Sequence, residues 1–176
     1  MLDNTNRKLY LAYGSNLNKQ QMASRCPRAI PIGTITLNGY QLVFRTVADI
    51  IKSKGSQAQF GLWSITPHCE KSLDRYEGFP NLYTKTQIEL AGTGIFAMTY
   101  KMVKGSYNYP SVCYYDTILQ GFNDFGLDTD YLSFAYQTTC DYIAEKDELE
   151  QNNSFQDSLK FVNNKLIHIN GGNNGK

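Results

Sequence analysis

The stretch that decides the fold is Tyr10-Leu11-Ala12-Tyr13-Gly14-Ser15-Asn16-Leu17. Its first half continues the short apolar and aromatic run that begins at Lys8, and such a run predicts a strand. Gly14, Ser15 and Asn16 follow at once, and these residue types accept the backbone angles of a tight turn. A turn at a strand end can direct consecutive N–H groups towards one point and so bind an anion. By itself, the segment favours an ordinary turn over an anion-binding one.

The residues after this turn predict more strands before any long helix. A brief helix capped by Asn18 is predicted up to Arg25, where Pro27 stops it. The other predicted elements are β segments over 32–46 and 60–65, a helix from Thr66-Pro67 to about Tyr76, and strands over 83–90 and 95–103.

The pattern becomes helical after Pro110. Tyr114, Ile118 and Phe122 recur every four residues, which predicts a helix to about Phe125, and a second helix is predicted over 130–144. Because strands come first and helices later, without strict alternation, the sequence predicts an α+β fold.

The C-terminal part of the chain is polar and rich in Asn. We predict one domain over 1–145 and a polar, partly disordered C-terminal extension over 146–176, which frays from Asn170. The extension contains apolar residues that predict an extra strand or a small docked arm: Leu159, Phe161, Val162, Leu166, Ile167 and Ile169.

Composition excludes several classes of protein. The 176 residues carry 17 Lys and Arg against 16 Asp and Glu. A net charge of +1 lacks the basic excess that is typical of proteins that bind nucleic acid, so we expect no nucleic-acid partner. No apolar run approaches the roughly 20 residues that cross a bilayer, and no signal peptide is apparent, so we expect no membrane partner and a cytoplasmic protein. The four cysteines lie far apart and predict reduced thiols (Cys26, Cys69, Cys113 and Cys140).

Histidine is too scarce for the common metal and nucleophile sites. His68 and His168 are the two histidines, and only Cys69 lies beside either of them. A metal site needs more convergent ligands than this, so we predict none. A Ser or Cys hydrolase would also need a nucleophile elbow, which the chain lacks.

Two further segments contain candidate functional residues. The first is Leu73-Asp74-Arg75-Tyr76-Glu77-Gly78-Phe79-Pro80, followed by Tyr83. Glu77 falls at a helix C-terminus, where the dipole disfavours an anion, and burial there would raise its pKa towards that of a general base. A solvent-facing Glu is the alternative. The second segment is Pro110-Ser111-Val112-Cys113-Tyr114, continuing through Ile118 and Gly121 to Tyr131, which alone is a helix with an aromatic core face.

Together the three segments resemble the γ-glutamylcyclotransferase-like (AIG2-like) family. The Y-G-S-N-L turn, the L-D-x-x-E-G segment and the P-S-x-x-Y-x-x-x-I-x-x-G helix occur in the family's order with similar separations, between Tyr10 and Tyr131. The resemblance implies a small mixed β-barrel with flanking helices and a pocket at its mouth. It also implies a reaction without metal or cofactor, in which the α-amine of a γ-glutamyl amide attacks its own γ-carbonyl and releases 5-oxoproline and a free amine.

The resemblance assigns roles to particular residues. Glu77 is implied to be the catalytic general acid and base, which takes the proton of the α-amine and returns one to the leaving amine. The implied substrate-binding residues are Tyr10, Leu11, Ala12, Tyr13, Gly14, Ser15, Asn16, Tyr83, Tyr100 and Tyr114. We expect loops near 46–58 and 104–109 to hold the leaving group.

Two other functions stay open at this point. A non-catalytic module that binds a small anion or metabolite could use the same fold, and so could an interaction scaffold that presents the acidic stretch 141–150. An acid at position 77 favours the enzyme, because a binder of anions would gain from a neutral or basic residue there. The substrate also stays open among γ-glutamyl amino acids, a γ-glutamylated amine and a γ-glutamyl-protected biosynthetic intermediate, as does association into a homodimer.

Overall fold

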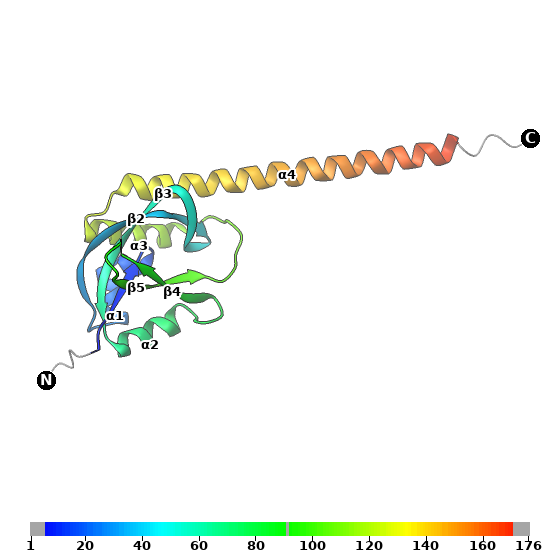
Figure 1. Ribbon diagram of the computed structural model, residues 1–176. Coiled ribbons are helices and arrows are strands. Elements are labelled where there is room, and N and C mark those ends of the chain that lie inside the picture. Colours follow the sequence, from blue (N-terminus) through cyan, green and yellow to red (C-terminus); the bar gives the residue numbers. More distant parts are fainter. Residues whose placement is uncertain (1–5, 91, 171–176) are drawn as a thin grey trace, which may run out of the picture. The chain divides into compact units, whose positions relative to one another are not determined.

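The computed structural model describes residues 6–90 and 92–170, with side chains up to residue 160. It is a mixed α+β structure, as the order of predicted elements indicated (Figure 1). The elements are β1 (Lys8–Ala12), η1 (Ser15–Leu17), α1 (Lys19–Arg25), β2 (Ile30–Arg45), β3 (Val47–Ile65), α2 (Pro67–Tyr76), β4 (Tyr83–Glu89), β5 (Phe96–Met102), α3 (Val112–Phe125) and α4 (Thr129–Asn170).

The strands form one five-stranded sheet in the order β2-β3-β1-β5-β4. The strand β1 lies in the middle, antiparallel to β3 and parallel to β5, and its residues from Tyr10 to Ala12 are buried, as expected of a strand covered on both faces. Within the described residues the edge strands β2 and β4 do not pair, so the sheet is not closed. The start of β3 nevertheless reaches the end of β5, where the Met102 N–H donates to Oδ1 of Asp49 at 2.9 Å.

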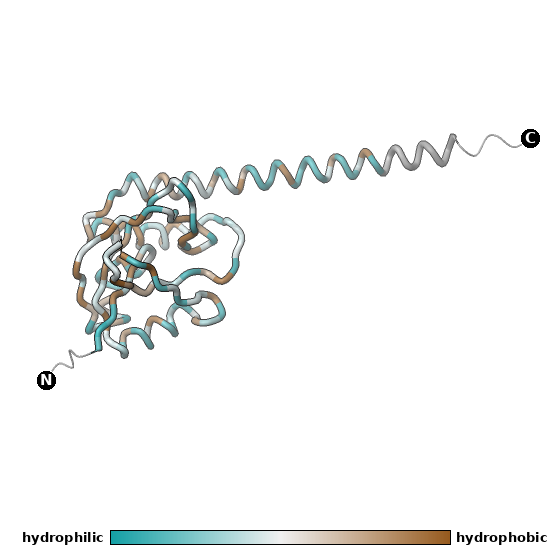
Figure 2. The backbone as a smooth tube through the Cα atoms, viewed as in Figure 1, coloured by the Kyte–Doolittle hydropathy of each residue, from teal (hydrophilic) through white to brown (hydrophobic). Residues whose placement is uncertain are grey.

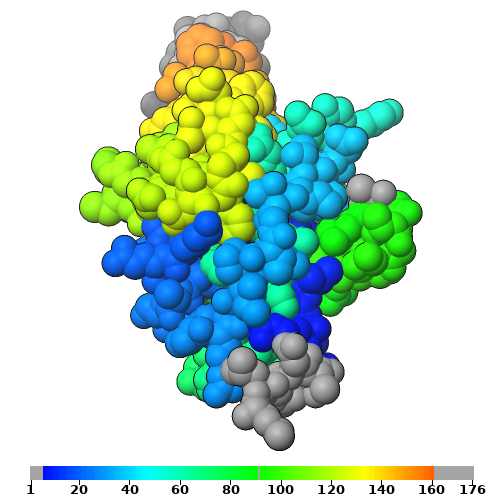
Figure 3. Space-filling view, turned by 90° about the vertical axis from the view of Figure 1, so that its left-hand side faces the viewer, coloured from blue at the N-terminus to red at the C-terminus, as the bar shows by residue number. Residues whose placement is uncertain are grey.

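The prediction of a loop over 46–58 is wrong, because these residues form the first half of β3. Their polar composition hides the strand, but residues 47–52 pair with residues 40–45 of β2, and after an irregularity the pairing resumes at Asn38↔Gln57. Partner strands satisfy the backbone groups whatever the side chains are. In Figure 3 the light-blue segment of β2 lies on the surface, and Ile30 and Ile32 are exposed. The other predicted loop, 104–109, is irregular as expected.

The predicted helix starts are confirmed by their caps. The side chain of Asn18 accepts the Gln21 N–H at 2.9 Å, and Thr66 accepts the Cys69 N–H at 3.2 Å. Ser111 caps α3 in the same way. Each cap satisfies an N–H group that has no acceptor within its own helix. These helices therefore begin where their sequences indicated.

The chain divides into two units, Met1–Thr139 and Cys140–Lys176. The backbone of the second unit continues α4 as a helix to Asn170, so the predicted extra strand is wrong. All side chains from Ala144 to Lys160 are exposed, and Figure 2 shows that most of them are hydrophilic. The predicted boundary near residue 145 stays a prediction. Fraying was predicted from Asn170, which is the last residue of α4, and the residues after it, 171–176, lie outside the described residues. None of the helices in the described part of the chain is long and apolar enough to span a membrane.

Candidate active site

A cavity of about 180 Å³ brings the three segments singled out in the sequence together. The turn after β1, the C-terminal end of α2 and the start of α3 all contribute side chains, and β3, β4 and β5 complete its wall. The lining residues are Tyr10, Tyr13, Gly14, Ser15, Asn16, Val47, Ala48, Tyr76, Glu77, Leu82, Tyr83, Tyr100 and Tyr114. Its wall is therefore largely aromatic, with one carboxylate.

Glu77 is that carboxylate. It is the C-cap residue of α2, held there because its N–H donates to the Leu73 carbonyl at 2.8 Å. Its side chain is partly buried, and its Oε1 atom accepts a hydrogen bond from Nδ2 of Asn16 at 2.7 Å. Burial raises the pKa of Glu77 from 4.5 to about 7, against the opposing effects of the Asn16 hydrogen bond and the Arg25 charge. A carboxyl group with this pKa can both accept and donate a proton near neutral pH.

The turn after β1 is a short 3-10 helix that places Asn16 against Glu77. The Asn16 side chain is buried, and its Nδ2 atom also donates to the Tyr10 hydroxyl at 2.8 Å. Trp63 fixes the Asn16 backbone, because its Nε1 donates to the Asn16 carbonyl at 3.1 Å. The first N–H groups of such a helix have no acceptor inside it. The turn therefore brings N–H groups and one amide to the edge of the cavity.

Gly14 allows this turn to approach β3 closely. A Cβ atom at position 14 would lie 3.1 Å from Cβ of Ala48 and 3.4 Å from the Tyr114 hydroxyl. A side chain here would therefore fill the cavity next to Glu77.

Two tyrosines bond the backbone of Ala48. The Tyr83 hydroxyl donates to the Ala48 carbonyl at 2.7 Å, and the Ala48 N–H donates to the Tyr114 hydroxyl at 3.1 Å. Burial raises the pKa of Tyr83 well above its ordinary value and that of Tyr114 to about 12, so both phenols are neutral at physiological pH. These tyrosines position the wall and carry no charge into the cavity.

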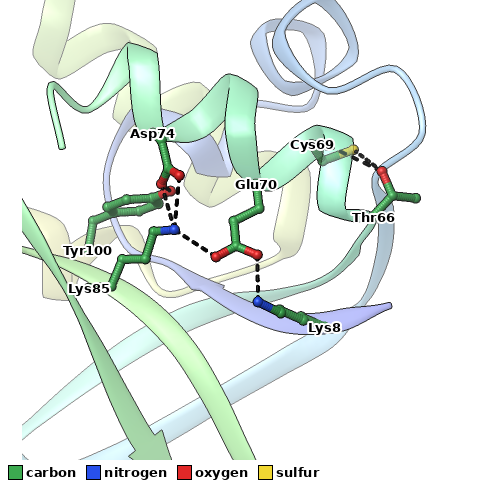
Figure 4. Close-up of polar contacts among 7 residues, drawn as sticks. All are labelled: Lys8, Thr66, Cys69, Glu70, Asp74, Lys85 and Tyr100. Atoms are coloured by element: carbon green, nitrogen blue, oxygen red, sulfur yellow. Dashed lines mark hydrogen bonds and ion pairs between the residues drawn. The ribbon is translucent and has the colours of Figure 1, made fainter. Parts of the chain in front are cut away.

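A charged network joins α2 to strands β1 and β4 of the sheet (Figure 4). Lys85 of β4 bridges Glu70 at 2.6 Å and Asp74 at 2.8 Å, and Lys8 of β1 reaches the other oxygen of Glu70 at 2.7 Å. The Tyr100 hydroxyl donates to Asp74 at 2.6 Å. Since Tyr100 lines the cavity and Asp74 belongs to the helix that carries Glu77, the network links the two.

Most of the residues implied by the family resemblance lie around this cavity. Leu11 and Ala12 do not: both belong to β1 and are buried in the core, with exposures of 0% and 1%. Side chains alternate between the two faces of a strand, so an unbroken run of site residues along β1 is not available.

Sequence reasoning missed Tyr76 and Leu82 of the lining, and Arg25, which contacts Asn16 without lining the cavity. Val47 and Ala48 lie within 46–58, which was expected at the site, although as a loop and not as a strand. Tyr76 had a signal, since it precedes Glu77. Leu82 and Arg25 are brought to the site only by tertiary contacts.

The described residues contain no group of three His, Cys, Asp or Glu side chains that could hold a metal ion. The prediction that no cofactor is needed stays a prediction. Chemistry at this site can use the Glu77 carboxyl group, the Asn16 amide, backbone N–H groups and neutral phenols.

Known proteins are similar to this chain in sequence and in fold. The model of the family described as "Gamma-glutamyl cyclotransferase, AIG2-like" matches residues 10–117. A bovine protein named γ-glutamylcyclotransferase is 27% identical over 139 residues, which cover 70% of this chain and 74% of that protein. A solved structure titled γ-glutamyl cyclotransferase has a TM-score of 0.67 at 25% identity, covering 74% of this chain and 86% of that one. An uncharacterized human protein has a TM-score of 0.65 at 26% identity, covering 73% and 86%.

Proposed function

Since this chain belongs to the γ-glutamyl cyclotransferase, AIG2-like family, we propose that it converts a γ-glutamyl amide into 5-oxoproline and a free amine. The observation that carries the proposal is Glu77, a partly buried carboxyl group with a pKa of about 7 in a small aromatic cavity. Titratable groups with strongly shifted pKa values in a cleft are typical of catalytic sites.

The proposed reaction is a proton transfer followed by ring closure. Ionised Glu77 takes a proton from the α-ammonium group of the substrate, which frees the nitrogen lone pair. That nitrogen attacks the γ-carbonyl carbon, a C–N bond forms, and the carbonyl oxygen becomes an oxyanion. The oxyanion then collapses, the bond to the leaving nitrogen breaks, and protonated Glu77 gives its proton to the departing amine. The ring nitrogen still holds two hydrogens and a positive charge, so it gives one proton to Glu77, which passes it to the free amine, and the amine leaves as an ammonium ion. Atoms balance without water, and Glu77 ends as it began.

The cavity supports this reaction by holding the substrate folded. A five-membered ring closes only when the α-nitrogen meets the γ-carbon, and such positioning supplies about 7–11 kcal/mol in the best intramolecular cases. Gly14, Ser15 and Asn16 line the cavity, and in this proposal their N–H groups bind the oxyanion or the substrate carboxylate. The leaving amine would lie towards Tyr76 and Leu82, which are the most exposed lining residues, at 47% and 62%.

The test is a panel of γ-glutamyl dipeptides and γ-glutamylamines, with 5-oxoproline measured by mass spectrometry. We expect product from the native chain, a loss of about 10²–10⁴-fold in Glu77→Gln, and native turnover in the control Glu89→Gln. Glu89 is an exposed glutamate at the far end of β4 that bonds the Gly94 N–H.

Two results would contradict the proposal. Undiminished turnover by Glu77→Gln would remove Glu77 from the reaction. No product from any substrate, with a small ligand retained on purification, would favour a binding module.

A further inference from the structure

Arg25 contacts both halves of the candidate active site, although it does not line the cavity. It is the last residue of α1, and its Nη1 atom donates to Oδ1 of Asn16 at 2.7 Å and to Oγ of Ser15 at 3.3 Å. Its Nη2 atom donates to Oε1 of Gln21. The guanidinium carbon lies 3.5 Å from the centre of the Tyr76 ring, so the group stacks on the residue before Glu77. One side chain thus joins the turn after β1 to the end of α2.

These contacts determine which way the Asn16 amide faces. Its Nδ2 atom uses both hydrogens, one towards Glu77 at 2.7 Å and one towards Tyr10 at 2.8 Å, while its oxygen faces Arg25. A flipped amide would set its oxygen against the Glu77 carboxylate and its hydrogens against the guanidinium group, which has only donors. Asn16 is 3% exposed, so water cannot replace the lost bonds.

We propose that Arg25 is a positioning residue of the site, which holds the Asn16 amide with its NH₂ group towards Glu77 and fixes Tyr76 beside it. The expected effect of Arg25 on turnover rests on the proposed function. The expected effect of Arg25 on the pKa of Glu77 does not. Arg25 stabilises the ionised form of Glu77 through the amide, because an anion gains from a donor that is itself polarised by a cation.

The charge of Arg25 is not duplicated by the other groups around Glu77. The titratable groups that face Glu77 are the phenols of Tyr10 from β1, Tyr13 directly after it, Tyr83 from β4, Tyr100 from β5 and Tyr114 from α3. Burial raises the pKa of every one of them, so all are neutral between pH 5 and 9. Among the described residues around Glu77, Arg25 is therefore the group with a positive charge that acts on it.

The test is a ¹³C NMR titration of the Glu77 carboxyl carbon in the full chain, assigned by its loss in Glu77→Gln. We expect Arg25→Met to raise the pKa of Glu77 by roughly half a unit or more. Arg28→Met, which removes the same charge from an exposed position three residues away, should leave it unchanged. Arg25→Lys keeps the charge but not the planar fork, so a smaller increase is expected. The Arg25→Lys variant also serves as the test if Arg25→Met does not fold.

A double-mutant cycle tests whether Arg25 acts through Asn16. In an Asn16→Ala chain, Arg25→Met should raise the pKa of Glu77 by less than it does in the native chain, because the direct effect of the charge remains and the effect through the amide is lost. An equal shift in both backgrounds would show direct action of the charge and overturn the relay, and no shift in the native background would overturn the proposal altogether.

Kinetics supply a separate result. With a γ-glutamyl substrate, the acid limb of kcat/KM should move upward with the NMR value, about threefold less activity at pH 6 for half a unit. If the native chain forms no 5-oxoproline, the proposed function fails, while the NMR titration still decides the role of Arg25.

Discussion

The hydroxyl group of Tyr100 lies 2.6 Å from Oδ1 of Asp74, three residues before Glu77 on the same helical segment. The Tyr100 ring packs edge-on against Tyr10, with ring centres 5.9 Å apart, and both rings line the cavity. Asp74 is also bonded to Lys85, whose other partner is Glu70. The position of Glu77 relative to the aromatic wall therefore depends on a charged network that does not itself enter the cavity.

Breaking this network should weaken both folding and turnover. We expect Asp74→Ala to lower the free energy of unfolding by about 1–3 kcal/mol, because Lys85 and the Tyr100 hydroxyl each lose a partner in a partly buried place. Urea unfolding followed by the fluorescence of Trp63, the one tryptophan of the chain, measures this. The control is Lys160→Met, which removes an exposed ion pair with Asp157 and should change stability by less than about 0.5 kcal/mol. Equal effects of the two variants would contradict this role for the network.

Tyr83 and Tyr114 should prove energetically coupled, because they bond the carbonyl and the N–H of the same residue, Ala48. Each Tyr→Phe change should cost about 1–2 kcal/mol of stability and raise KM, and the double variant should differ from the sum of the two by roughly 0.5 kcal/mol or more. Tyr131→Phe is the matched control. Its hydroxyl accepts the Leu42 N–H at 3.2 Å outside the cavity, so it should lose similar stability without a change in KM. Strict additivity would show that Ala48 does not couple the two tyrosines.

A side chain at Gly121 should displace the turn after β1, which lies between Gly121 and the cavity. Gly121 of α3 packs against η1, and a Cβ atom there would lie 2.5 Å from Cβ of Leu17 and 2.7 Å from the backbone nitrogen of Asn18. The backbone atoms at this contact cannot move without disturbing the fold. We therefore expect Gly121→Ala to lower the free energy of unfolding by about 1–3 kcal/mol and to displace the turn that carries Asn16. Thermal unfolding and turnover measure the two effects. Asn123→Ala, an exposed change on the same helix, should be close to neutral, and a fully native Gly121→Ala would contradict the packing argument.

Local signals predicted most of the elements around the site. Asn18, Thr66-Pro67 and Ser111 mark helix starts through their own side chains, and Glu77 falls at the helix end that its position before Gly78 indicated. The first half of β3 could not be predicted in this way, because pairing with β2, and not its own residues, makes it a strand. Arg25 was missed for the same reason, since only the approach of α1 to α2 brings it to Asn16 and Tyr76.

Glu77 should make the protein less stable as pH rises, which is the opposite of the usual effect of a carboxyl group. The pKa of this group is about 7 in the folded state and near 4.5 when unfolded, so the folded state binds more protons between these values. Its contribution to the free energy of unfolding therefore falls as pH rises from 4.5 to 7, by up to about 3 kcal/mol. Glu77→Gln should remove this loss, so that the variant gains stability relative to the native chain between pH 5 and 8. Urea unfolding across that range measures the difference.

Glu70 provides the opposite case. Burial opposes its ionisation, but the hydrogen bonds and charges of Lys8 and Lys85 together lower its pKa below 4.5. Its stabilising contribution is therefore present above that value and is lost as pH falls through the lowered one. Glu70→Gln should be less stable than the native chain at pH 7, with the difference shrinking at low pH. The same sign for both glutamates would contradict the environments described for them.

The central claim is that the α-nitrogen of a γ-glutamyl amide closes the ring at the Glu77 site. The most direct measurement uses a γ-glutamyl amide that the protein converts, labelled with ¹⁵N at the α-amine. The reaction is run in H₂¹⁸O, and the masses of both products are measured by mass spectrometry. We expect all ¹⁵N in 5-oxoproline, no ¹⁸O in either product and no label in the released amine. Glutamate carrying ¹⁸O would show that water attacks the γ-carbonyl, and it would contradict the intramolecular reaction.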